Sequence, residues 1–467
     1  MPRLYVETFG CQMNEADSRF VRERASAAGY TLADRPEEAD VVVLNTCTVR
    51  DHAERRAYGR ITHLKALKDA DPGVRVVVTG CLAEQDRDRM QAIAPHVDAV
   101  FGTSELARLA DQLAAWSSEF EERDPGAEAR ALLAPLGGGE SDAGPFARLR
   151  GYATVQRGCS YYCTFCIVPH VRGRFDHRPM HEILSDVRAA VAAGAREVLL
   201  VGQTVNAWRD PASGAGFGEL CAATAAVAGV ERVAFISPHP KDFDEAMIRR
   251  FAELPALAPR VHLPLQSGSD AVLRRMNRKY TRTQFEEKVA LFRRYLPDWA
   301  ITTDIIVGFP GETDGDFEQT LELVRAGTFA NAYMFMYSMR RGTPAARWPQ
   351  VPDEIKKERF SRLVEAQNAV TLAYHRSKIG SVERALVSGP SKRDPGKLAA
   401  KTGDNVTVIA PMPPDYDEER YRAEPWVDVA VEAAHPWGCT GTVIGRAAHR
   451  DEPAQPVRPP IIDLLAT

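Results

Sequence analysis

Three cysteines stand close together in the stretch GCSYYCTFC, at Cys159, Cys163 and Cys166. A structural zinc site normally takes four Cys or His ligands, and nearby His170 and His177 could complete one, so zinc remains an alternative. Three thiolates spaced as Cys-x3-Cys-x2-Cys favour instead a [4Fe–4S] cluster in which the protein holds three of the irons. The fourth iron then keeps an open position where a small molecule can bind.

A second set of three cysteines is scattered through the first eighty-one residues. Cys11, Cys47 and Cys81 each follow a short apolar, β-branched run, namely RLYVETF (3–9), VVVLNT (41–46) and VRVVVTG (74–80). The carboxyl ends of the strands in an open α/β sheet line the binding crevice. We therefore expect these three thiols to converge in space. The alternative is that they are three unrelated buried cysteines.

The elements that must position these cysteines follow from the alternation of strand-like and helix-like segments. Residues 3–119 alternate in the manner of a parallel sheet with covering helices. Six further β/α repeats predict an incomplete β/α barrel, whose chemistry belongs at the carboxyl ends of its strands. Short strand-like segments near the C-terminus predict a small β-barrel. The expected α/β organisation is an N-terminal α/β domain (1–119), a linker (120–147), a partial (β/α)6 barrel (148–376), a small β-barrel (377–446) and a mobile tail (447–467).

Composition places few further limits on function. The chain has 467 residues, which suggests about three domains. Its net charge of −4 does not exclude nucleic acid, because a basic face can occur on an acidic protein. No apolar run reaches membrane-spanning length, and the N-terminus lacks the pattern of a signal peptide. We therefore expect a cytoplasmic protein without a membrane partner, whose reduced thiols serve as ligands.

The first cysteine motif carries a resemblance to a known family. A Cys-x3-Cys-x-aromatic-Cys loop after the first strand of a partial barrel resembles the signature of radical S-adenosylmethionine (SAM) enzymes. The resemblance implies that SAM binds the open iron and is cleaved to a 5′-deoxyadenosyl radical. It also implies that Phe165 lies near the adenine, and that VGQ (201–203), LQSGSD (265–270) and VGFPGE (307–312) contact SAM. The implied SAM contacts are Phe165, Gly202, Gln203, Gln266 and Gly308.

The second cysteine set narrows the resemblance to the methylthiotransferases, over about residues 2–446. It implies an auxiliary [4Fe–4S] cluster at Cys11, Cys47 and Cys81, beside the SAM cluster at Cys159, Cys163 and Cys166. No catalytic residue is identified beyond these ligands. GCQMNEADS (10–18) and GPSKRDPG (389–396) resemble the branch that acts on isopentenylated adenosine in tRNA. Thr204 and RGRFDHRP (172–179) depart from its usual pattern.

The resemblance implies a reaction and its partners. A methylthio group is added at C2 of N6-dimethylallyladenosine at position 37 of tRNA, next to the anticodon, with one SAM supplying the methyl group and another the radical. An electron donor such as flavodoxin or ferredoxin is implied, and a monomer is expected. The alternative within the family is action on threonylcarbamoyl-adenosine. A remote alternative is a non-catalytic zinc-binding RNA adaptor.

The predicted C-terminal barrel resembles the TRAM domain, an RNA-binding module. Residues 376–404 hold seven basic and three acidic side chains, and Lys392, Arg393 and Lys401 are the predicted phosphate contacts. A solvated charged surface is the alternative. A second basic run, between Arg274 and Arg282, is predicted either to follow the anticodon stem or to form an exposed helix face.

Overall fold

The structure is a computed structural model, and it describes residues 1–49, 51–121 and 146–447. Most of the predicted linker (120–147) and of the predicted tail (447–467) lies outside the described residues. The chain forms two compact units. The first takes in Met1–Ala143, Arg157–Tyr162 and Cys166–Asp176; the second takes in Gly144–Gln156, Cys163–Phe165 and His177–Thr467. No helix in the described part of the chain is both long and apolar enough to span a membrane.

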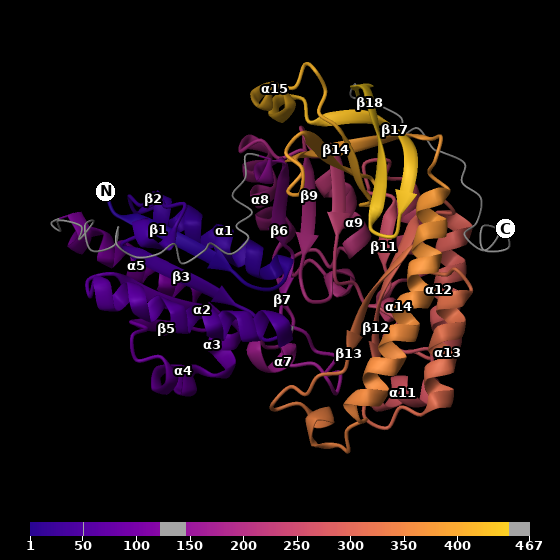
Figure 1. Ribbon diagram of the computed structural model, residues 1–467, viewed down its shortest axis with the longest axis horizontal. Helices are drawn as coiled ribbons and strands as arrows, with labels where there is room; N and C mark the ends of the chain where they lie inside the picture. The colour runs from indigo at the N-terminus through magenta and orange to yellow at the C-terminus, as the bar shows by residue number, and fades with distance from the viewer. Residues whose placement is uncertain (50, 122–145, 448–467) are drawn as a thin grey trace. The chain divides into compact units, whose positions relative to one another are not determined.

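The first unit is built on a five-stranded parallel sheet, drawn in indigo to purple in Figure 1. Its strands, in the order β2-β1-β3-β4-β5, are β1 (Arg3–Thr8), β2 (Thr31–Leu32), β3 (Val41–Thr46), β4 (Arg75–Gly80) and β5 (Ala99–Phe101). All of β3 is buried, as expected for a central parallel strand covered on both faces. Helices α1 (Gln12–Ala27) and α5 (Leu106–Glu121) pack on one face, and α2 (Asp51–Ala70) packs on the other.

The second unit contains the six parallel strands expected of a partial barrel. They pair as two three-stranded sheets, β10-β9-β6 and β11-β12-β13, and a single bridge between Val233 and Leu257 continues the pairing beyond β10. The strands are β6 (Arg150–Thr154), β9 (Glu197–Val201), β10 (Arg232–Phe235), β11 (Arg260–His262), β12 (Ala300–Val307) and β13 (Asn331–Met336). The helices between them are α8 (Met180–Ala192), α9 (Phe217–Ala225), α10 (Glu245–Ala252), α11 (Asp270–Arg275), α12 (Arg282–Tyr295) and α13 (Asp314–Arg325).

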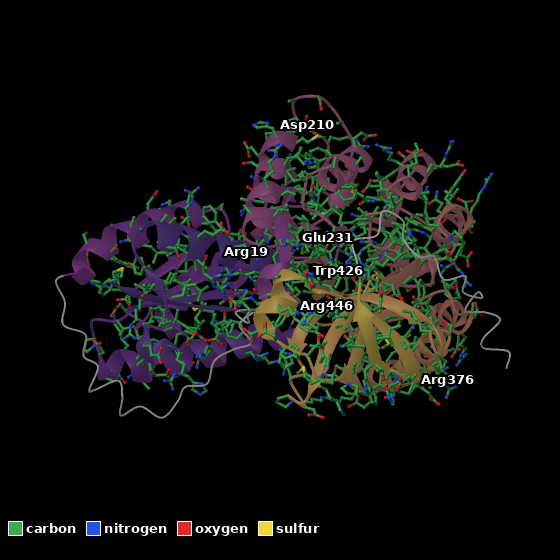
Figure 2. All side chains as sticks on the ribbon, turned by 90° about the horizontal axis from the view of Figure 1, so that it is seen from above. Arg19, Asp210, Glu231, Arg376, Trp426 and Arg446 are labelled. Atoms are coloured by element: carbon green, nitrogen blue, oxygen red, sulfur yellow. The ribbon has the colours of Figure 1, made fainter. Side chains whose placement is uncertain are left out.

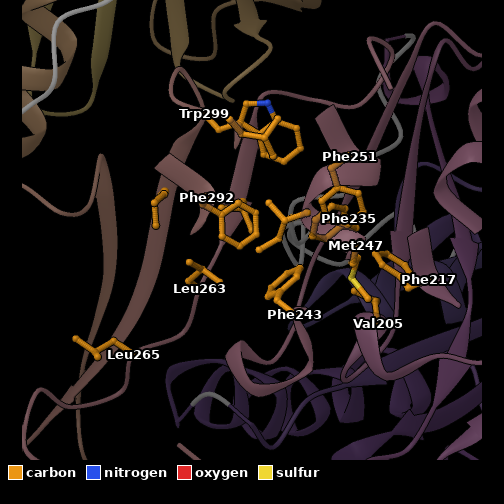
Figure 3. Packing of buried hydrophobic residues seen from close by; sticks show 14 of the residues in the cluster. Val205, Phe217, Phe235, Phe243, Met247, Phe251, Leu263, Leu265, Phe292 and Trp299 are labelled. Carbon is orange, nitrogen blue, oxygen red and sulfur yellow. The ribbon is translucent and has the colours of Figure 1, made fainter. Parts of the chain in front are cut away.

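An aromatic core fixes the strands of this partial barrel against their helices (Figure 3). The Phe243 ring meets Phe292 edge to face with centroids 5.1 Å apart, and Phe251 stacks on Trp299 at 6.1 Å. Buried aromatic pairs of this kind add about 0.5–1.5 kcal/mol each beyond the area they bury. The core therefore holds the strand ends, and the loops that leave them, in fixed positions.

A long helix and a closed barrel complete the second unit (Figure 1). Helix α14 spans Asp353–Arg376, as predicted, and packs along β13 and α13. The five-stranded barrel closes in the order β14-β15-β16-β18-β17, which confirms the predicted small β-barrel. Its elements are β14 (Val382–Pro390), β15 (Lys397–Thr402), β16 (Thr407–Pro411), α15 (Glu418–Ala423), β17 (Trp426–His435) and β18 (Gly438–Arg446).

Partly buried charged side chains join the closed barrel to the amino ends of the parallel strands. Figure 2 labels Trp426 of the barrel and Glu231, which directly precedes β10. Arg384 lies over the Trp426 ring at 4.3 Å and forms an ion pair with Glu231 at 3.0 Å. Beside them Glu197 is fully buried and pairs with Arg150 at 2.7 Å and with Arg232. The closed barrel is therefore fixed at the end of the strands opposite to the predicted chemistry.

Candidate functional site

The three N-terminal cysteines follow three adjacent strands of the parallel sheet, β1, β3 and β4. Cys11 is the N-cap residue of α1, Cys47 directly follows β3, and Cys81 is the first residue of α3 (Cys81–Gln85). Cys47 and Cys81 are buried, and Cys11 is partly exposed. Since neighbouring parallel strands end at one edge of a sheet, the structure brings these thiols together as the sequence predicts.

Two residues of the GCQMNEADS motif hold the first two cysteine loops against each other. Gly10 has φ +124°, and a Cβ atom there would lie 2.4 Å from the Cβ of Cys47. Asn14 donates from Nδ2 to the carbonyl oxygens of Phe9 and Thr46, both at 3.0 Å. Neither residue was predicted to have a role, although both stand in a motif that carries the family resemblance.

A buried arginine lies against the third cysteine. The Nε of Arg172 is 3.2 Å from the Sγ of Cys81, and its Nη2 donates to Asn14 Oδ1 at 3.1 Å and to Asp17 Oδ2 at 2.9 Å. Burial raises the pKa of Cys81 to about 12, and the nearby charge of Arg172 opposes that rise. Cys47 and Cys11 raise the pKa of Cys81 further, which places all three thiols within electrostatic range of one another.

The donor set of this site fits an iron–sulfur cluster. A single ion needs all of its ligands around one point, and in the described residues no group of three or more His, Cys, Asp or Glu has that arrangement. A [4Fe–4S] cluster takes one thiolate per iron, so its ligands are spread over a larger cofactor. Three thiols at one sheet edge, with a buried guanidinium beside them, suit such an anionic group.

The second cysteine set follows β6 in the loop 158–166. The backbone N–H of Cys159 donates to Gly173 O at 3.0 Å. Cys163 is buried, and Arg278 Nη1 lies 3.3 Å from its Sγ. This cysteine, like Cys81, therefore has an arginine donor beside its sulfur. Arg278 comes from the basic run 274–282, so one member of that run points inward and not to an RNA surface.

Two glutamines near the strand ends have buried polar atoms that no group in the described part of the chain satisfies. Gln156 begins the short strand β7 (Gln156–Arg157), and both polar atoms of its side chain lack a hydrogen-bond partner among the described residues; so does Oε1 of Gln203, after β9. A Cβ at Gly202 would be 2.9 Å from the Cγ of Gln156. Buried unsatisfied polar groups are costly, so they indicate a polar ligand. Gly202 and Gln203 were predicted from the sequence, whereas Gln156 was missed.

The remaining predicted SAM contacts also lie at carboxyl ends of the strands. Gln266, before α11, and Gly308, after β12, both have φ +68°, which is ordinary for a glycine but, in a non-glycine residue such as Gln266, often marks a functional site. The Gly308 N–H donates to Glu312 Oε2 at 2.6 Å. Burial raises the pKa of Glu312 to about 7, against the opposing effects of that N–H and of Arg359. Phe165 is partly buried and meets Phe309 edge to face at 6.4 Å.

The structure separates the three predicted RNA-binding residues into two environments. Lys392 and Arg393 are exposed in the turn between β14 and β15. Lys401 is partly buried on β15, where burial, Arg150 and Arg260 lower its pKa to about 8. The third residue therefore faces the charged junction between the barrel and the strands.

Comparison with known proteins identifies the class to which this arrangement belongs. Residues 154–324 match the radical SAM superfamily, and residues 3–102 match an uncharacterised protein family, UPF0004. A solved structure of the radical SAM methyltransferase TsrM from Kitasatospora setae shares the fold, with a TM-score of 0.53 at 15% identity over 74% of this chain and 75% of that one. The partial barrel with its cysteine loop is thus that of a radical SAM enzyme, whose cofactors are SAM and a [4Fe–4S] cluster.

Relatives found by sequence comparison narrow the superfamily to one family of enzymes. The tRNA-2-methylthio-N6-dimethylallyladenosine synthase of Syntrophotalea carbinolica is 40% identical over 89% of this chain and 95% of its own length. The synthases of Mycobacteroides abscessus and Vibrio parahaemolyticus are 42% and 38% identical, over 85% and 87% of this chain and 79% and 86% of their own lengths. The chain belongs to this family of methylthiotransferases, which uses two clusters.

Proposed function

We propose that this protein adds a methylthio group at C2 of N6-dimethylallyladenosine at position 37 of tRNA. The observation that carries the proposal is the pair of cysteine triads. The N-terminal triad follows three parallel strands and the second triad follows β6, in a chain that matches synthases of this name over most of their length. Two separate ligand sets suit a reaction that must both make a radical and deliver sulfur, because one open iron cannot hold SAM and the sulfur together.

The chain's own residues have distinct tasks in this proposal. Cys159, Cys163 and Cys166 hold the SAM cluster, which when bound supplies the electron for SAM cleavage. Phe165, Gly202, Gln203, Gln266 and Gly308 bind SAM. Gln156 joins them on the strength of its unsatisfied polar atoms. Cys11, Cys47 and Cys81 hold the auxiliary cluster, which carries the sulfur.

The same proposal assigns the RNA and protein partners. Lys392 and Arg393 contact tRNA phosphates, because both are exposed on the closed barrel. Lys401 belonged to the same prediction, but its pKa of about 8 and its arginine neighbours make it the weakest of the three. The protein acts as a cytoplasmic monomer and receives electrons from a donor such as flavodoxin or ferredoxin.

The decisive experiment measures nucleosides. The full chain, reconstituted with iron and sulfide, is incubated with SAM, a reductant and prenylated tRNA, and digested RNA is analysed by mass spectrometry. We expect the 2-methylthio nucleoside from prenylated tRNA and not from unprenylated tRNA. Product from threonylcarbamoylated tRNA alone would favour the other branch of the family. Colourless protein containing zinc, in place of about eight irons, would favour the adaptor.

Two variants separate the cysteine triads. Replacing Cys11, Cys47 and Cys81 together with Ala is expected to abolish the methylthio nucleoside while SAM cleavage to 5′-deoxyadenosine continues. Cys163→Ala is expected to abolish both, with the auxiliary cluster retained. A wild-type yield of methylthio nucleoside from the triple variant would show that the sulfur comes from elsewhere.

A further inference from the structure

Arg172 is a buried side chain that contacts three residues around the N-terminal cysteines. Its side chain is 4% exposed, and its donors reach the Cys81 sulfur, the Asn14 amide oxygen and the Asp17 carboxylate. Asn14 and Asp17 both belong to α1, which begins directly after Cys11. One guanidinium therefore connects the helix that follows the first cysteine to the sulfur of the third.

Two arginines approach one buried carboxylate beside the N-terminal cysteines. Asp17 is 2% exposed, and it pairs with Arg172 at 2.9 Å and with Arg157 at 3.4 Å. Two guanidinium groups thus share one carboxylate. A buried charge without a partner is strongly unfavourable. Arg157 is 34% exposed to solvent, whereas Arg172 is buried beside Cys81 and within electrostatic range of Cys11, where thiolates of a bound cluster would add compensating negative charge.

Arg172 also lies on a short segment that carries a ligand of the other cluster. Cys166 stands six residues before Arg172, and the helical turn α7 (Val168–Val171) lies between them. Cys81 packs against Ile167 and Val171 of this segment in a small apolar cluster. Through this packing the short segment that carries Cys166 lies against Cys81 within the first unit.

We propose that Arg172 is a positioning residue for the auxiliary cluster: it donates a hydrogen bond to the Cys81 sulfur and compensates the cluster's negative charge. Hydrogen bonds to sulfur and local charge both set the reduction potential of an iron–sulfur cluster. Reduction adds negative charge, so a fixed positive charge nearby stabilises the reduced form. Arg172 therefore raises the potential of the auxiliary cluster and slows its loss of iron. This inference rests on the proposed two-cluster function.

The test isolates the auxiliary cluster. The full chain with Cys159, Cys163 and Cys166 replaced by Ala is the parent, and its midpoint potential is measured by redox titration followed by electron paramagnetic resonance. In this background Arg172→Met is expected to shift the potential to more negative values. It is also expected to weaken iron retention against a chelator by about 10- to 100-fold. Arg172→Lys keeps the charge but loses the planar set of donors. Its midpoint potential and its iron retention are expected to lie between those of the parent and those of Arg172→Met.

Arg278→Met is the matched control, because Arg278 contacts Cys163 and not the auxiliary ligands. It should leave the potential of the auxiliary cluster unchanged. An unchanged potential and unchanged iron retention in Arg172→Met would overturn the proposal, as would an equal shift in Arg278→Met. If circular dichroism shows that Arg172→Met does not fold, Arg172→Gln and Arg172→Lys decide the question by the same two measurements. Neither measurement needs tRNA, so a failure of the nucleoside assay would count only against the proposed function.

Discussion

Arg278 donates from Nη1 toward the sulfur of Cys163 at 3.3 Å, while its Nε lies 3.1 Å from the hydroxyl of Tyr280. The Tyr280 hydroxyl in turn donates to the carbonyl oxygen of Pro264 at 2.7 Å. This chain of contacts holds the guanidinium against a predicted ligand of the SAM cluster. It parallels the contact of Arg172 with Cys81 in the other unit, although the two arginines come from unrelated segments.

We expect Arg278→Met to slow SAM cleavage by about 10- to 100-fold, the usual effect of removing a partner that orients a metal ligand. The physical reason is the loss of both a donor to the Cys163 sulfur and a compensating charge. Formation of 5′-deoxyadenosine under excess reductant measures the effect. Arg274→Met is the control, since Arg274 is exposed on the same basic run. Equal rates in the two variants would show that the contact with Cys163 has no role in cleavage.

Gly10→Ala tests the packing of the first two cysteine loops. The new Cβ would lie 2.4 Å from the Cβ of Cys47, and φ +124° is strained for alanine. We expect a loss of about 1–3 kcal/mol in the free energy of unfolding of the apoprotein, together with loss of the auxiliary cluster. Urea denaturation and iron content measure the two effects.

Gly59→Ala is the matched control for this substitution. Gly59 lies inside α2, and a Cβ there would meet no atom of the described residues within 4 Å. Alanine in a helix interior is favoured over glycine by roughly 0.5–1 kcal/mol, so this variant should be more stable and keep both clusters. Unchanged stability and full iron content in Gly10→Ala would contradict the close approach of the two loops.

Lys392 and Arg393 test the RNA-binding role of the closed barrel. Replacing both with Gln is expected to weaken tRNA binding and to reduce the slope of log K against log salt concentration by about 0.7–0.9 for each phosphate that the variant no longer neutralises. Fluorescence anisotropy over a series of salt concentrations measures the slope. SAM cleavage without tRNA should stay at the level of the parent. A slope equal to that of the parent would place the phosphate-binding groups on another surface.

Much of the fold follows from local sequence pattern. The run VVVLNT is apolar and β-branched throughout most of its length, and it forms the fully buried central strand β3. The predicted helix 353–376 appears with the same bounds, because its charges and apolar residues alternate at helical spacing. The expected strand RVHLPLQ is much shorter than its apolar pattern suggests. It ends at His262, since Pro264 cannot donate to the sheet and Gln266 has φ +68°.

The cysteine ligands of the site were predictable from the sequence, but the residues that support them were not. The cysteines are recognisable by residue type and spacing. Their supporting residues act across long sequence distances, as when Arg172 contacts Cys81, and no periodicity marks such a pair. Lys401 was predicted to contact phosphate because it stands in a segment rich in basic residues. A count of basic residues in a segment cannot tell an exposed lysine from a partly buried one. Only the fold reveals that Arg150 and Arg260 lie near its ammonium.

Lys401 yields a prediction about pH. Burial, Arg150 and Arg260 lower its pKa from 10.5 to about 8 in the folded protein. Between those two values the unfolded chain binds the proton more than the folded one does, so folding becomes more favourable as pH rises. The free energy of unfolding of the parent should therefore increase relative to that of Lys401→Met between about pH 8 and pH 10.5. Below pH 8 the charged Lys401 destabilises the folded protein most. In that range the free energy of unfolding of Lys401→Met should exceed that of the parent by the largest amount.

Urea denaturation across this range gives the difference between the parent and Lys401→Met. Lys397→Met is the control, because Lys397 is exposed on the same strand. Its substitution removes only an exposed ion pair with Asp394 at 3.3 Å, which contributes little to stability, so the free energy of unfolding of Lys397→Met should stay close to that of the parent. A difference between parent and Lys401→Met that stays constant from about pH 8 to pH 10.5 would show that the ammonium keeps its ordinary pKa and does not lie near Arg150 and Arg260.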